Sequence, residues 1–65
     1  MLIPADMRNA QSAEVHIIAA RANRARAEME LNQAENFARL ILNKQKQNEI
    51  MNGIQQVRRA LLNKG

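Results

Sequence analysis

The positions of proline and glycine constrain this chain more than any other feature. The single Pro is residue 4 and the two Gly residues are 53 and 65, so the segment from Ala5 to Asn52 contains neither. Helix formers such as Ala, Leu, Gln, Arg and Met are abundant, whereas residues that favour strands are few. The sequence therefore predicts an all-α chain with one long helix at about residues 6–43 and a shorter amphipathic helix at about 49–63.

The exact start of the first helix is left open by the sequence. Asp6 is a suitable N-cap soon after Pro4, and Ser12 is a later alternative. Neither is followed by Glu or Gln at the third position, so no capping box selects between them.

The long helix carries two apolar stripes on opposite sides. The first stripe follows heptad spacing through Val15, Ile18, Ala22, Ala25 and Met29. The second stripe lies roughly 180° around the helix and consists of Ala27, Leu31, Ala34, Ala38 and Ile41. Because both stripes are rich in Ala, neighbouring helices can approach them closely.

Residues 43–48 are polar on every side and are predicted to connect the two helices, although nothing in them forbids a continuous helix. The third stripe follows in the shorter helix and consists of Ile50, Ile54, Val57 and Leu61. Gly53 falls inside this helix at a cost of about 1 kcal/mol relative to Ala. The chain is thus expected to form a helical hairpin or a near-continuous rod.

The length of the chain makes a partner necessary in either arrangement. A chain of 65 residues has a thin core, and with no Cys and one His it has neither disulfides nor an evident metal site to compensate. A hairpin or a rod leaves at least one apolar stripe in water, which is typical of an interface. We therefore expect coiled-coil-like packing against copies of itself or a larger protein complex, as in a structural or assembly subunit. Short Ala-rich helices of virions and secretion machinery offer an architectural analogy.

Charge suggests a first alternative function. Residues 1–38 carry a net charge of −1, whereas residues 39–65 carry +5. The candidate anion-binding residues are Lys44, Lys46, Arg58, Arg59 and Lys64. They would support sequence-independent binding of nucleic acid, although aromatic residues for base stacking are missing. In the first part, Arg24–Glu28, Arg26–Glu30 and Glu35–Arg39 have the spacing of ion pairs along a helix.

A second alternative is a helix that binds a membrane surface or regulates one partner protein. Residues 49–64 combine an apolar stripe with basic residues, as such helices do. The chain has no Trp, and its only Phe lies outside this segment, so the membrane surface is disfavoured.

The sequence gives no indication of an enzyme. His16 is the only imidazole and has no Cys or metal-ligand partner at a suitable spacing, and no Gly-rich phosphate loop occurs. We predict no catalytic residue, no metal, no cofactor and no small-molecule substrate. No signal peptide or membrane-spanning run is apparent, so the expected location is the cytoplasm or the interior of an assembled particle.

Overall fold

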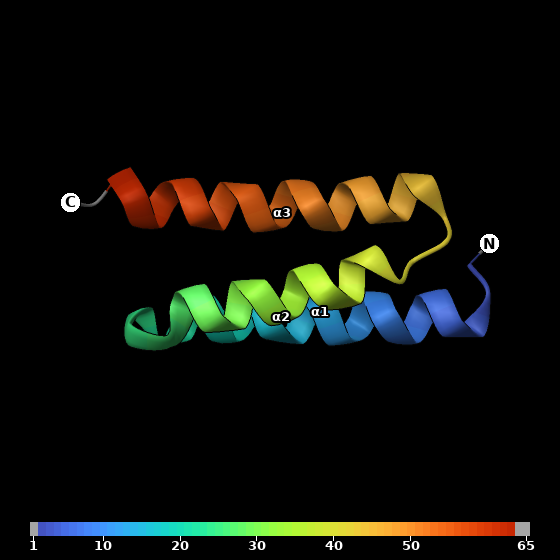
Figure 1. Ribbon diagram of the computed structural model, residues 1–65, viewed down its shortest axis with the longest axis horizontal. Coiled ribbons are helices and arrows are strands. Elements are labelled where there is room, and N and C mark those ends of the chain that lie inside the picture. Colours follow the sequence, from blue (N-terminus) through green and yellow to red (C-terminus); the bar gives the residue numbers. More distant parts are fainter. Residues whose placement is uncertain (1, 64–65) are drawn as a thin grey trace.

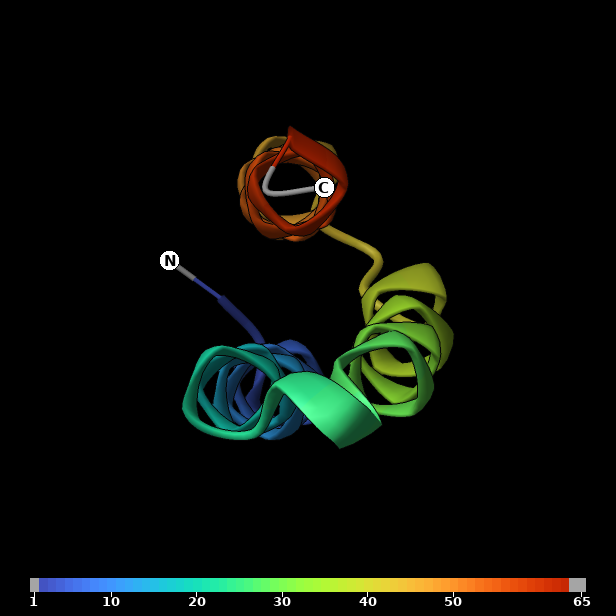
Figure 2. The same ribbon diagram turned by 90° about the vertical axis from the view of Figure 1, so that its left-hand side faces the viewer.

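The computed structural model describes residues 2–63 and forms an antiparallel arrangement of three helices. Helix α1 spans Pro4–Ala22, α2 spans Ala27–Arg39 and α3 spans Lys44–Asn63, with a 3-10 turn, η1, at Arg24–Arg26. Successive helices run in opposite directions along the long axis of a body of 39 × 16 × 14 Å (Figure 1). Seen from the end, α1 and α2 lie side by side and α3 lies over the pair (Figure 2). The all-α prediction is confirmed, since residues 2–63 contain no strand.

The long helix predicted over residues 6–43 is wrong, because it is interrupted at Asn23. This residue has extended backbone angles, φ −137° and ψ 100°. Its side-chain Oδ1 accepts a hydrogen bond of 3.1 Å from the N–H of Ala25 and so begins η1. Asn side chains compete with the helix in this way because they bond to backbone groups close by in sequence. The chain reverses here, so it is neither a two-helix hairpin nor a rod.

This reversal lets the chain cover its own second stripe. All five residues of the second stripe are at most 2% exposed. Four of them lie on α2 and Ile41 lies in the loop that follows, and α2 packs against both α1 and α3. Helix α3 contributes Ile50, Ile54 and Val57 to the same core, with Leu61 partly buried beside it. Helix α1 contributes Ala10, Ala13 and Ala20. The second stripe therefore forms the chain's own core, and it does not require the partner that the predicted hairpin would have needed.

The first turn of α1 differs from the expected capping. Pro4 is the first helical residue and Ile3 takes the N-cap position without a side-chain hydrogen bond. Asp6 lies inside the helix, 2% exposed, and its two carboxylate oxygens accept hydrogen bonds of 2.8 Å each from the N–H groups of Leu42 and Asn43. The carboxylate thus ties α1 to the connection between α2 and α3.

Residues 40–43 connect α2 to α3, so the connection lies earlier in the sequence than the polar segment 43–48 that was predicted to form it. Helix α3 begins at Lys44, and Asn43 caps it by accepting a 2.9 Å hydrogen bond from the N–H of Lys46. The amide of Gln47 donates to the carbonyl oxygens of Ala38, in the last turn of α2, and Ile41, just beyond it, and the Ala38 oxygen also accepts from the N–H of Ile41. The polar residues therefore close two helix ends instead of forming the loop.

Gly53 lies in the middle of α3 and its backbone is helical. A Cβ added there would lie 3.8 Å from Ile17 Cδ1, an ordinary van der Waals contact. We expect Gly53→Ala to raise the free energy of unfolding by about 0.5–1 kcal/mol, because Ala restricts the unfolded chain and favours helix. Urea unfolding followed by circular dichroism measures this, with exposed Gln55→Ala in the same helix as control. A lower urea midpoint for Gly53→Ala would contradict the packing described at this site.

Candidate interaction surfaces

The first stripe remains exposed, in contrast to the second. Val15 is 57% exposed, Ile18 is 66% exposed and Met29 is 57% exposed. The break at Asn23 divides the stripe, so that Val15, Ile18 and Ala22 lie on α1, Ala25 lies in η1 and Met29 lies on α2. The part on α1 forms one line, because its spacing of three and four residues returns to the same side of a helix.

Helix α1 has an inverted distribution of apolar residues. Its buried side holds Ala10, Ala13 and Ala20, whereas the larger Val15 and Ile18 face solvent on the opposite side. Full burial of Val or Ile contributes about 1.5–3 kcal/mol, more than Ala can provide. A single exposed apolar residue is ordinary in a folded protein, but an aligned set marks a candidate docking surface. We call Val15, Ile18 and Ala22 the outer face of α1.

Two of the predicted anion-binding residues are occupied by carboxylates of the chain itself. Arg58 Nη2 lies 2.7 Å from Glu35 Oε1 and 3.3 Å from Asn32 Oδ1, and Arg58 Nε lies 3.6 Å from Glu28 Oε1. The hydrogen bond that Arg58 donates to the Glu35 carboxylate raises the pKa of Arg58 above its ordinary value. Because the pKa of Arg58 is raised in the folded protein, the stability from this contact between α2 and α3 is fully present below the unfolded pKa of the arginine and is lost only as the pH rises through the folded pKa.

Lys46 is also engaged within the chain, at 3.6 Å from Glu14 and 3.6 Å from Glu49. Lys44 and Arg59 are exposed, and Lys64 lies outside the described residues. The predicted anion-binding residues that the structure describes therefore include two that hold helices together and two that remain in solvent.

Only one of the ion pairs predicted along the first helix has formed within residues 2–63. Glu35 lies 3.8 Å from Arg39, as expected from their spacing. Glu28 is instead paired with Arg58 and Glu30 with His16. Arg24 lies in η1, where the chain turns, so the helical spacing on which its predicted pair relied is lost.

His16 links α1 to α2. Its Nδ1 lies 2.6 Å from Glu30 Oε1, and its ring stacks on Phe37 with a centroid distance of 5.6 Å and an interplanar angle of 13°. Sequence reasoning did not associate these residues, because they lie 14 or more positions apart and come together only through the reversal at Asn23.

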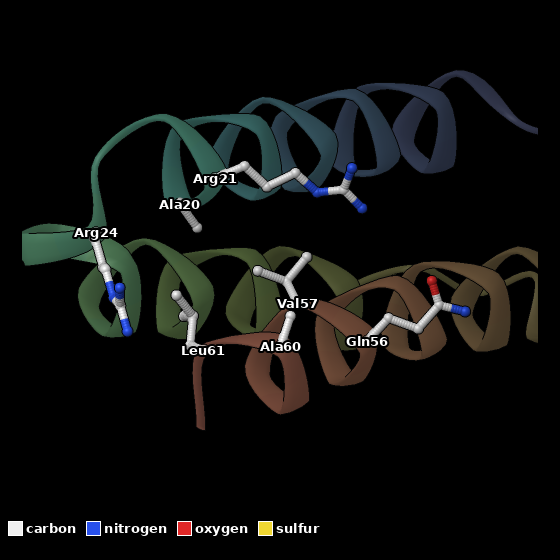
Figure 3. A pocket seen from close by; sticks show the side chains of 7 residues that line it. All are labelled: Ala20, Arg21, Arg24, Gln56, Val57, Ala60 and Leu61. Atoms are coloured by element: carbon white, nitrogen blue, oxygen red, sulfur yellow. The ribbon is translucent and has the colours of Figure 1, made fainter. Parts of the chain in front are cut away.

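A groove of about 320 Å³ lies where the C-terminal ends of α1 and α3 meet. The side chains of Ala20, Val57, Ala60 and Leu61 form its apolar floor (Figure 3). Arg24 lies beside Leu61 at one end, while Arg21 and Gln56 lie toward the other (Figure 3). This groove could not be predicted from the sequence, since its residues belong to two segments that are distant in sequence.

Comparison with protein-family models, with characterised proteins and with solved structures finds no match for this chain. No helix within residues 2–63 is long and apolar enough to cross a membrane. The same residues contain no group of three or more His, Cys, Asp and Glu side chains that could hold a metal ion.

Proposed function

We propose that this protein is a structural or assembly subunit that associates with copies of itself through the outer face of α1. The observation that carries this proposal is the inversion of α1, which buries alanines and exposes Val15 and Ile18 at 57% and 66%. The second stripe and most of the third are buried in the core, whereas the aligned residues of the outer face of α1 remain in solvent. A second helix of the same kind supplies a matching apolar line.

Charges beside the stripe favour an antiparallel pair. Glu14 and Arg21 are one heptad apart, and each immediately precedes a residue of the outer face. A two-fold axis between antiparallel α1 helices brings Glu14 of one copy toward Arg21 of the second copy, twice in each pair. Parallel helices would instead place like charges at the same level. Glu14 is 52% exposed despite its contact with Lys46, and Arg21 is exposed, so both are accessible to a second copy.

The size of this face predicts weak association. Covering the exposed parts of Val15 and Ile18 in two copies yields about 4–7 kcal/mol before the entropy of association is subtracted. Free energies of this size correspond at best to dissociation constants between about 1 mM and 10 μM. We therefore expect pairing at high concentration, which becomes effective where many copies are held together in one assembly.

The direct test is sedimentation equilibrium between about 10 μM and 1 mM, the range in which the predicted association develops. We expect the mass of the wild-type chain to rise with concentration, and that of the Val15→Gln/Ile18→Gln variant to remain at the monomer value. Leu62→Gln is the matched control, because Leu62 is 74% exposed but lies on α3.

Reversal of charge then tests the orientation. Glu14→Arg or Arg21→Glu alone should weaken the pair, and the double variant Glu14→Arg/Arg21→Glu should restore it. A folded wild-type chain that stays monomeric throughout would overturn self-association. A dimer that depends on Val15 and Ile18 but does not respond to the charge reversals would overturn only the antiparallel arrangement.

The nucleic-acid alternative is less favoured by the arrangement of charge. Two of its candidate residues, Lys46 and Arg58, are already paired with carboxylates of the chain. The membrane-surface alternative is disfavoured because Ile50, Ile54 and Val57, its proposed lipid-facing residues, are buried in the core.

A further inference from the structure

We propose that the groove between α1 and α3 binds an aliphatic carboxylate, with the hydrocarbon chain on the groove floor and the carboxylate on an arginine. The floor of the groove is formed by other residues than the outer face of α1, and Arg24 takes no part in the proposed pairing of α1 helices, whereas Arg21 borders both surfaces. The proposed site also departs from the expectation that the chain has no small-molecule ligand.

The floor provides apolar surface that the chain itself leaves open. Ala20 and Val57 are buried beneath the groove, whereas Leu61 is partly buried and Ala60 is exposed. Alanines occur on both sides, from α1 and from α3, and their small side chains leave the space between the helices unfilled (Figure 3). The volume of about 320 Å³ falls at the lower end of the range typical of small-molecule sites.

The charge of the groove selects an anion. Arg21 and Arg24 line it, and none of its other lining residues is acidic. Neither arginine makes an ion pair within residues 2–63, whereas Arg58 is held by Glu35 and Glu28. A guanidinium binds a carboxylate through two parallel N–H donors, so it matches this head group in shape as well as in charge.

The neighbouring depression on the other side of Leu61 provides a comparison. It has a volume of about 250 Å³ and is lined by Glu28 and Arg58 in addition to Arg24. Because Glu28 lies 3.6 Å from Arg58, its charges are largely matched inside the protein. Arg24 lines both depressions, but the groove between α1 and α3 adds Arg21 and no carboxylate, so it has the larger excess of positive charge, which is the reason for placing the ligand there.

The experiment is an NMR titration of the ¹⁵N-labelled chain with decanoate, kept below its micelle-forming concentration. We expect saturable shifts of the amide signals of Ala20, Val57 and Leu61. Arg21→Gln/Arg24→Gln should weaken binding about tenfold, the loss that corresponds to one charge-assisted hydrogen bond. Arg24→Gln alone should weaken it less. Arg8→Gln is the matched control, since Arg8 is exposed on α1 but lies outside the groove.

Three further titrations test the charge, the floor and the location of the site separately. Decanol, which has the same chain without the charge, should bind at least tenfold more weakly than decanoate, and Ala60→Leu should abolish binding by filling the floor. The Val15→Gln/Ile18→Gln variant should bind decanoate as the wild type does, which distinguishes this site from the outer face of α1. Absence of saturable shifts, equal binding of decanol, or equal loss in Arg8→Gln would each overturn the proposed site.

Discussion

Leu31→Ala is expected to lower the free energy of unfolding by about 2–5 kcal/mol. Leu31 is completely buried in the middle of α2, where it contributes to the core formed with α1 and α3. The substitution loses the free energy of transferring the removed atoms from water to the core, and it leaves a cavity that the surrounding helices fill only in part. A chain of 65 residues has a total stability of only about 3–10 kcal/mol, so this one substitution consumes much of it.

Urea unfolding followed by far-ultraviolet circular dichroism measures this effect. Leu62→Ala is the matched control, because it removes the same atoms from a side chain that is 74% exposed, and its loss should stay below about 0.5 kcal/mol. Equal losses for the two variants would contradict the placement of α2 in the centre of the core.

Asp6→Ala is expected to lower the free energy of unfolding by about 2–4 kcal/mol. The buried carboxylate accepts two hydrogen bonds of 2.8 Å from backbone N–H groups of Leu42 and Asn43. Hydrogen bonds to a charged group contribute about 1.5–3 kcal/mol each, and their loss leaves both donors without this partner. Asp6→Asn should lose less, because its amide retains one acceptor oxygen.

Hydrogen exchange provides a readout specific to this contact. In Asp6→Ala, the amides of Leu42 and Asn43 should exchange faster than they do in the wild-type chain. The exchange rates of amides in the middle of α2 should increase less. Glu49→Ala is the control, since Glu49 is a 60% exposed carboxylate whose ion pair within residues 2–63 is with Lys46, and its effect should stay within about 0.5 kcal/mol. Unchanged exchange at Leu42 and Asn43 would show that Asp6 does not hold the connection between α2 and α3.

The failure to predict the break at Asn23 has a physical cause. Asn is a moderate helix former and carries no backbone restriction of the kind that Pro imposes, so local preference does not exclude a continuous helix. The break is stabilised by contacts distant in sequence, such as the bond between His16 and Glu30 and the stacking of His16 on Phe37. These contacts exist only after the chain has reversed.

The assignment of apolar stripes shows a second limit of sequence reasoning. Periodicity identified Val15 and Ile18 as readily as it identified Leu31, yet the first two are exposed and the third is buried. In α1 the buried apolar positions are alanines, with Ile17 partly buried beside them, and spacing and hydrophobicity rank alanine below Val and Ile. Close packing of small residues against α2 decided which side of α1 faces inward, and such packing is a property of the pair of helices.

Composition and helical spacing were sufficient to predict that the chain is helical and that residues 27–41 and 50–61 each carry an apolar stripe. The number of helices, the bond between Asp6 and a distant turn and the groove between α1 and α3 could not be predicted in this way. Each of these depends on atoms brought together from separate segments, whereas periodicity describes one segment at a time.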